Sequence, residues 1–324
     1  MIVSQGRFCR VATVYFEEEP VPVDVDIVHY IQRSSPVPGS VHSVFCTIVL
    51  NLGRDPDALL ANMHRNTRNE IRHGIRKGLR HFAWSNNPAI LEHACDFYDR
   101  FASLKGLPPA GRRYLRLLLE AGQLDLSVVR DGERELVWHA YYRTPERVLN
   151  LISASLFMAH ADATERALIG IANRYHTWMD MLMYKQAGIA IFDQGGWYDG
   201  TTDQEKLRIN NFKERFGGTI VRNFDCHRAI TLKGALMLQV RGLMGRLGID
   251  RWKVQLLLRR ALPRRRRRHV ESLPAAPSAA ANDQPRAEPR EKYQDQAVEG
   301  LLLEPVLDAQ AKRESAQSGE RQRH

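Results

Sequence analysis

The spacing of hydrophobic and polar positions changes several times along the chain, and each change predicts an element. Residues 8–16 are rich in β-branched and aromatic side chains, and residues 21–28 alternate apolar and polar positions. Both patterns are typical of half-buried strands. A third strand is predicted over residues 41–52, after a break that contains two prolines and a glycine. The first fifty residues are therefore expected to supply strands to a sheet.

Helical spacing begins near residue 55 and is expected to continue to Gly78. Three arginines four residues apart, Arg68, Arg72 and Arg76, form a basic stripe beside an apolar one. Two further helices are predicted over residues 88–104 and 111–122. The apolar stripe of the first helix consists of Leu59, Met63, Thr67, Ile71 and Ile75.

The second half alternates strands and helices. Asp131-Gly132 is a strong hairpin signal between two strand patterns, and the pair Gly195-Gly196 is expected to end a short strand. This order predicts a mixed α/β domain with a partly antiparallel sheet. The predicted strands cover 124–130, 135–143, 148–155, 189–193 and 219–225, and the predicted helices cover 164–187 and 203–215.

Composition differs from that of the rest of the chain mainly at the C-terminus. Residues 233–268 form a basic amphipathic helical pattern that ends in five consecutive arginines. Residues 269–324 are too polar to offset their ordering entropy and are expected to be a disordered tail. We therefore expect a smaller N-terminal α/β part over 1–122, a core domain over 123–232, the basic segment and the tail.

The formal net charge of +10 favours a polyanionic partner such as nucleic acid, an acidic membrane face or a phosphorylated substrate. The four cysteines form no Cys-x-x-Cys pair and have no histidine at metal-ligand spacing, so we expect no disulfide and no metal site. The N-terminus lacks the apolar core of a signal peptide, and no window is apolar enough to span a membrane. These observations predict a cytoplasmic protein.

Residues 170–224 carry the most informative motifs. A helix ends at Ala187-Gly188, a strand ends in DQGG (193–196), and the next helix contains NFKERFGG (211–218). This order resembles the FemAB-like branch of the N-acetyltransferase (GNAT) superfamily, in which a DxGG strand end precedes an FKxxFGG helix end. Residues 51–78 are similar to the arginine-rich helix of the same family. The resemblance covers residues 45–225 and implies a GNAT-like mixed sheet flanked by helices.

Asp193 and Lys213 are the candidate catalytic residues. Asp193 follows an apolar run, where its carboxylate can accept a proton from an amine, orient the substrate, or cap the amides of Gly195 and Gly196. Lys213 matches a lysine that the resemblance associates with the donor or the reaction centre, although a solvated helix lysine is the simpler alternative. The glycine pair permits positive φ and close approach of a ligand.

Donor binding is expected near the start of the long helix, where free amides and the helix dipole suit an anion. The resemblance implies a coenzyme A loop there, but only one of its two glycine positions is kept strictly. Acyl-CoA and aminoacyl-tRNA both remain candidate donors. The candidate donor-binding residues are Arg166, Gly170, Ala172, Asn173 and Arg174.

Acceptor binding is assigned to residues on three segments. Arg68 and Arg72 can bind a diphosphate through bidentate guanidinium contacts, or can simply form a solvated face. Tyr198 and Asn211, with the glycine pair, are expected to line the pocket. The histidines are scattered, and His176 and Asp180, four apart on one helix, are expected at its surface.

The resemblance implies an acyl or aminoacyl transferase that acts on an amine, less readily a hydroxyl, of a phosphorylated or lipid-linked precursor of the cell wall or a surface polysaccharide. Direct attack on an activated donor needs no permanently bound cofactor. A second interpretation stays open, in which an inactive GNAT-like protein binds membrane or nucleic acid. The basic segment 233–268 resembles an interfacial helix and could hold the chain on the inner face of the cell membrane.

Overall fold

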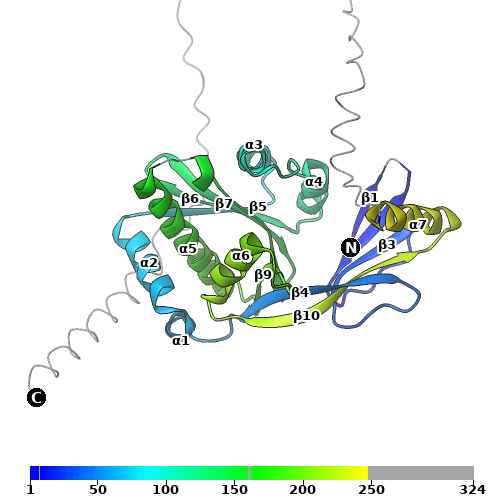
Figure 1. Cartoon of the computed structure of the whole chain (residues 1–324), viewed down its shortest axis with the longest axis horizontal. Helices are drawn as coiled ribbons and strands as arrows, with labels where there is room; N and C mark the ends of the chain where they lie inside the picture. Colours follow the sequence, from blue (N-terminus) through cyan, green and yellow to red (C-terminus); the bar gives the residue numbers. More distant parts are fainter. Residues whose placement is uncertain (7, 160–161, 247–324) are drawn as a thin grey trace, which may run out of the picture. The chain divides into compact units, whose positions relative to one another are not determined.

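In the computed structural model, described for residues 1–6, 8–159 and 162–246, one ten-stranded mixed sheet forms the centre of the fold. The chain divides into two compact units, Met1–Met244 and Gly245–His324, and the sheet belongs to the first. The strand order is β1-β2-β3-β10-β4-β9-β8-β7-β6-β5. Figure 1 shows the helices that cover this sheet. The mixed α/β class predicted from the sequence is confirmed.

Strands β2–β3 and β8–β9 pair in parallel, and the other neighbours pair antiparallel. Strands from residues 1–122 and from residues 123–232 alternate within this sheet, since β4 lies between β10 and β9. The strands are β1 Ile2–Gln5, β2 Arg10–Tyr15, β3 Ile27–Arg33, β4 Val41–Asn51, β5 Arg80–Ser85, β6 Leu124–Asp131, β7 Arg134–Arg143, β8 Arg147–Ser155, β9 Ile191–Trp197 and β10 Thr219–Ala229.

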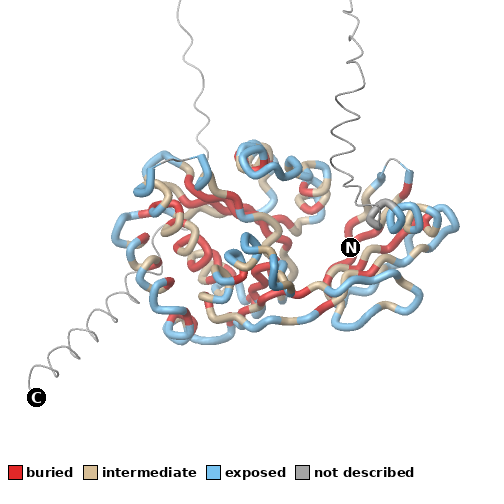
Figure 2. Tube along the Cα trace, in the orientation of Figure 1, coloured by how far each residue is buried: buried red, intermediate tan, exposed pale blue. Residues whose placement is uncertain are grey.

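The helices lie on both faces of the sheet, and alternation along each strand separates two sets of core contacts. On β7, Trp138 and Tyr142 pack with α3 and α4, whereas Val137 and Tyr141 pack with α5. Figure 2 shows the buried residues concentrated in the strands and the inner sides of the helices. The helices are α1 Pro56–Asn62, α2 Arg65–Arg76, α3 Pro88–Lys105, α4 Arg112–Glu120, η1 Phe157–Ala159, α5 Ala163–Gln186, α6 Gln204–Glu214 and α7 Leu232–Arg246.

The predicted strand over residues 21–28 is wrong. The sequence alternates there, but Pro20 and Pro22 lack the N–H that a ladder requires, and Val21 and Val23 are exposed. The strand β3 instead begins at Ile27. The alternating pattern therefore predicted a strand in this region but placed its start at residue 21 instead of Ile27.

The helix predicted from residue 55 to Gly78 is divided in two. The break falls at Met63 and His64, where the His64 ring accepts a hydrogen bond from the amide of Asn66 and caps α2. The apolar stripe still faces the core across the break, because Leu59, Met63 and Ile71 are all buried.

The basic segment predicted over 233–268 lies partly within the described residues, as α7. The rest of that segment and the tail 269–324 lie outside them. Among the helices of the described residues, none is both long and apolar enough to cross a bilayer.

Candidate active site

Strands β8 and β9 start as neighbours and then diverge. They pair in parallel only from Arg147↔Ile191 to Leu149↔Asp193, after which β9 keeps its pairing with β4 as far as Trp197. Within the part of the chain that the structure describes, residues 151–155 of β8 therefore have no strand partner on that side. The divergence exposes backbone donors and acceptors at the point where the DQGG motif begins.

The glycine pair lies inside β9, not beyond its end as the sequence predicted. Gly195 has a φ of +74°, and a Cβ there would lie 2.8 Å from the carbonyl oxygen of Asn150 on β8. Gly196 has no positive φ, and a Cβ there would meet only Phe45 at ordinary contact distance. The expected left-handed backbone is thus confined to Gly195, where the two strands separate.

Asp193 is fully buried, and its carboxylate is enclosed by donors. Its Oδ1 accepts hydrogen bonds from the amide of Gly195 at 2.8 Å and from the hydroxyl of Thr47. Its Oδ2 lies 2.5 Å from Arg147 Nη2. The capping role considered from the sequence is thus realised at Gly195, and these contacts favour a carboxylate that positions the backbone over one that exchanges protons with a substrate.

Arg147 was missed by sequence reasoning and lies at the centre of this network. Its Nη2 also donates to Oε1 of Gln32 at 2.6 Å, and its guanidinium lies 4.0 Å from the ring centroid of Phe16. Phe16 and Gln32 both have positive φ, 57° and 58°, which is uncommon outside glycine. Two strained residues on two different strand ends therefore hold the guanidinium that neutralises Asp193.

Lys213 lies on α6 and reaches back to the glycine pair. Its Nζ donates a hydrogen bond to the carbonyl oxygen of Gly196 at 2.7 Å. Burial lowers the pKa of Lys213 from 10.5 to about 8, and the charge of Asp193 acts in the opposite direction. A substantial fraction of this amine is therefore neutral just above physiological pH.

Asp193 and Lys213 approach β9 from opposite sides. Phe192 packs in the same cluster as Phe212 of α6 and Phe216 just after this helix, so the next side chain, Asp193, points to the other face. The structure brings Lys213 to the carbonyl of Gly196, three residues along β9 from Asp193.

Most of the candidate donor-binding residues, Asn173 and Arg174 among them, do not lie near the start of the long helix, where donor binding was expected. The helix α5 starts at Ala163, and Asp162 caps it by accepting hydrogen bonds from the amides of Thr164 and Glu165. The amides of residues 170–174 lie more than a turn inside the helix and are used within it. Of the five candidate donor-binding residues, only Arg166 lies in the first turn, where it is half-buried.

Two of these candidates, Ala172 and Arg174, make contacts that hold the fold together. Ala172 is fully buried against the sheet, so its side chain faces the core. Arg174 pairs with Glu70 of α2 at 2.7 Å, lies over the ring of Phe212 and donates to the carbonyl of Gly170. The pKa of Arg174 is lowered, and burial of the guanidinium is the main cause. This arginine joins α2, α5 and α6 behind the site.

The other acceptor-side candidates are distributed over α2 and the β9–α6 region. Arg68 of α2 donates to the carbonyls of Ala61 and Met63, so it caps the end of α1. Arg72, also on α2, is half-buried. Asn211 is exposed. The backbone of Tyr198 is fixed by both ends of the Asn210 amide, at 3.0 and 2.7 Å. Asn210, rather than Asn211, therefore holds the loop that follows the glycine pair.

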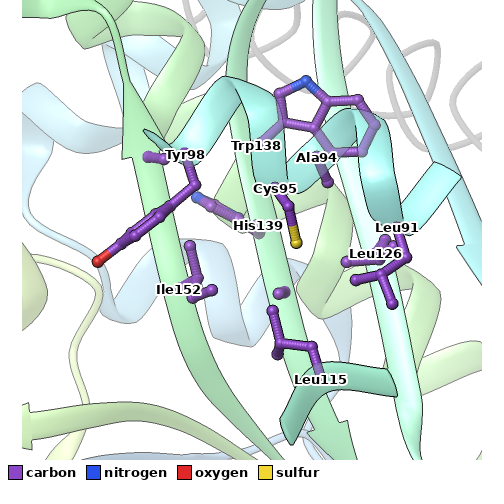
Figure 3. A pocket seen from close by; sticks show the side chains of 11 residues that line it. Leu91, Ala94, Cys95, Tyr98, Leu115, Leu126, Trp138, His139 and Ile152 are labelled. Atoms are coloured by element: carbon purple, nitrogen blue, oxygen red, sulfur yellow. The ribbon is translucent and has the colours of Figure 1, made fainter. Parts of the chain in front are cut away.

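A small pocket lies elsewhere, between α3, α4 and the sheet (Figure 3). Its lining is mostly apolar, and Cys95 points into it beside Leu115 and Leu126. Burial raises the pKa of Cys95 to about 11, so the sulfur stays a thiol at neutral pH. None of the candidate site residues lines this pocket.

The expectation that His176 and Asp180 lie at the helix surface is also wrong. Both side chains have no exposed area, because they point from α5 onto the sheet. The signal that could have revealed this is the run of apolar residues around them, which leaves the helix without a clear polar face.

No protein-family profile matches the sequence, and no curated protein matches it. Solved structures with similar folds include FemX, with 12% identity, a TM-score of 0.46 and coverage of 60% of this chain and 63% of FemX. The C-terminal domain of a putative lysylphosphatidylglycerol synthetase from Agrobacterium fabrum is 15% identical, with a TM-score of 0.45 and coverage of 67% of this chain and 72% of that domain. A tandem GNAT protein from the clavulanic acid biosynthesis pathway is 11% identical, with a TM-score of 0.34 and coverage of 63% of this chain and 68% of that protein.

The chain thus spans less than two thirds of FemX. These likenesses, all below 25% identity, concern the fold alone.

Proposed function

We propose that the chain transfers an acyl or aminoacyl group from an activated ester or thioester to an amine. The observation that carries this proposal is the divergence of β8 and β9 at Asp193, beside the carbonyl of Gly196 and the amine of Lys213. Direct transfer requires two substrates to meet in a fixed geometry, and most of the rate then comes from positioning and charge stabilisation.

The open edge of β8 suits an extended donor that contains amides, such as the arm of coenzyme A. Unpaired strand edges bind extended chains through main-chain hydrogen bonds. The net charge of +10 equally suits aminoacyl-tRNA, whose phosphates attract lysine and arginine. Both donors carry a carbonyl carbon bonded to a good leaving group, sulfur in one case and oxygen in the other.

In the proposed reaction the acceptor nitrogen attacks the donor carbonyl, and the C–S or C–O bond breaks as the amide forms. The acceptor proton leaves with the thiol or hydroxyl product. Protonated Lys213 stabilises the developing oxyanion, while Asp193 and Arg147 hold the Gly195 turn in place. The acceptor class is an amine-bearing precursor of the cell wall or a surface polysaccharide.

The test is a product assay with purified full-length protein, acyl-CoA or aminoacyl-tRNA, and a panel of amine acceptors, read by mass spectrometry. Lys213→Met should reduce turnover by roughly 100-fold or more while the thermal midpoint stays unchanged. The matched control is Lys206→Met, because Lys206 lies on the same helix but pairs with Asp203. Equal turnover in both variants would refute the role of Lys213.

We further propose that α7 attaches the enzyme to an anionic membrane. Four apolar side chains lie three or four residues apart on one exposed face of this helix, with Leu232 91% and Leu236 62% exposed. Gly234 holds the opposite face against β3, since a Cβ there would lie 2.1 Å from the carbonyl of Asp26. An apolar stripe beside basic residues is typical of interfacial helices. The stripe consists of Leu232, Leu236, Val240 and Leu243.

Flotation with vesicles of phosphatidylglycerol and phosphatidylcholine tests this attachment. Leu236→Glu together with Leu243→Glu should abolish flotation and leave turnover on a soluble acceptor unchanged. Ile209→Glu, at an exposed apolar residue on α6, should leave flotation unchanged. Flotation of the double variant would contradict the attachment without touching the proposed chemistry.

A further inference from the structure

A cluster of histidines is buried between α5 and the edge of the sheet formed by β5, β6 and β7. The helix lies over β6 and β7, and Figure 1 shows it crossing this part of the sheet. Asp180 and His176 point down from α5, and neither has exposed area. His139 on β7 is 2% exposed, and the His81 side chain on β5 is 9% exposed. Four titratable groups from three elements thus meet in the interior.

Asp180 is the centre of this cluster. One oxygen, Oδ1, lies 2.8 Å from His81 Nε2. The other, Oδ2, lies 2.7 Å from His139 Nδ1 and 2.7 Å from the hydroxyl of Tyr141. No lysine or arginine of the described residues forms an ion pair with it. Two histidines and a tyrosine hydroxyl thus surround this buried carboxylate, and a bound cation would neutralise its charge.

His176 adds a further ligand atom from the helix. Its Nε2 lies 3.5 Å from Asp180 Oδ2 and 2.8 Å from the hydroxyl of Ser127. Its ring stacks on that of His139, with 3.8 Å between centroids. The ligand atoms of His81, His176 and Asp180 all lie within 4.8 Å of one another. They converge on one point from β5 and α5.

We propose that His81, His176 and Asp180 bind a divalent transition-metal ion, with zinc as the preferred metal. Zinc takes imidazole nitrogen and carboxylate oxygen at 2.0–2.2 Å, so tetrahedral ligands lie about 3.3 Å apart. His81 Nε2 lies 2.8 Å from Asp180 Oδ1, which is shorter than this value, and all three ligand atoms lie within 4.8 Å of one another. The His81 ring must therefore move slightly away from Asp180 when an ion binds.

The remaining groups suit the surroundings of such an ion. His139 and Tyr141 keep their hydrogen bonds to Asp180 and fix the orientation of its carboxylate, as residues around metal ligands commonly do. The Ser127 hydroxyl or a water can fill the fourth position. The ion neutralises the Asp180 carboxylate and ties the edge strand β5 to α5. This site is independent of the proposed transfer at β9.

The test uses full-length protein stripped with a chelator, dialysed against zinc and analysed by mass spectrometry of the metal. We expect one zinc ion per folded chain and a higher thermal midpoint with zinc than without. His176→Ala and Asp180→Asn should each reduce the zinc content at least about 10-fold. His93→Ala is the matched control, because His93 is exposed and pairs with Glu135 outside the cluster.

Cobalt provides a measurement that does not depend on the variants folding. Wild-type protein loaded with Co²⁺ should show the intense visible absorption of a tetrahedral site, lost on addition of one equivalent of zinc. Folded wild-type protein that retains no zinc and gives only the spectrum of aqueous cobalt would overturn the proposal. Equal zinc content in the control and both cluster variants would overturn it as well.

Discussion

Arg147 Nη2 lies 2.5 Å from Oδ2 of Asp193, a carboxylate with no exposed area, and this pair joins the starts of β8 and β9. The Arg147 side chain is itself only 16% exposed. Removing one partner of a buried pair leaves the other charge uncompensated, which typically costs about 3–5 kcal/mol.

We therefore expect Asp193→Asn and Arg147→Gln each to lower the free energy of unfolding by about 3 kcal/mol. The double variant should lose clearly less free energy of unfolding than the two single variants lose together, because it leaves neither charge uncompensated. Urea unfolding of the four proteins measures this cycle. Arg134→Gln is the control, since its pair with Glu165 is exposed and should contribute under about 1 kcal/mol. Strict additivity of the two changes would contradict the coupling.

The glycine pair provides a second prediction with its own control. Gly195→Ala places a Cβ 2.8 Å from the Asn150 carbonyl on a backbone with φ of +74°. The left-handed conformation alone costs about 1–2 kcal/mol, and the clash adds to it, so we expect a loss of about 2–4 kcal/mol. Gly196→Ala has ordinary contacts and should change stability by less than about 1 kcal/mol. Similar thermal midpoints for the two variants would show that the turn relaxes freely.

A stacked histidine pair predicts acid sensitivity. His29 and His227 face each other across β3 and β10 with 4.1 Å between ring centroids. Burial lowers the pKa of His29 from 6.5 to about 3 and that of His227 to about 4, with Arg241 adding to both effects and His227 also lowering the pKa of His29. Below pH 6.5 the unfolded chain therefore takes up protons that the folded chain does not.

Stability should accordingly fall as pH drops from 6.5 towards 4, by up to about 1.4 kcal/mol per pH unit for each histidine. Replacing both residues with Phe keeps an aromatic pair and should flatten this part of the profile. Urea unfolding at a series of pH values measures the slope. An unchanged slope in the double variant would assign the acid sensitivity to other groups.

The sequence predicted most elements because their signals are local. The hairpin of β6 and β7 follows from Asp131-Gly132, and the end of the long helix follows from Gly188. Strand β5 was missed because residues 80–85 mix basic and aromatic residues without clear alternation. Which side chains of β5 face the core is determined by its pairing with β6.

The site was predicted in part for the same reason. Asp193 and Lys213 lie in motifs with recognisable spacing, whereas Arg147 reaches Asp193 from 46 residues away, and Gln32 holds Arg147 from 115 residues away. The buried cluster is similar, since His81 meets Asp180 across 99 residues of chain. Contacts of this kind depend on strand order, which no local pattern contained.

The lowered pKa of Lys213 predicts how the proposed transfer depends on pH. With a pKa of about 8, the ammonium loses its proton as pH rises from 7 to 9. If its charge stabilises the oxyanion, kcat/KM should fall through a midpoint near pH 8. Lys213→Arg should move that fall above about pH 10, because a guanidinium keeps its proton there. Lys206→Arg should leave the midpoint in place. A limb that rises through pH 8 would instead make Lys213 a base, and an unshifted midpoint in Lys213→Arg would assign the titration to another group.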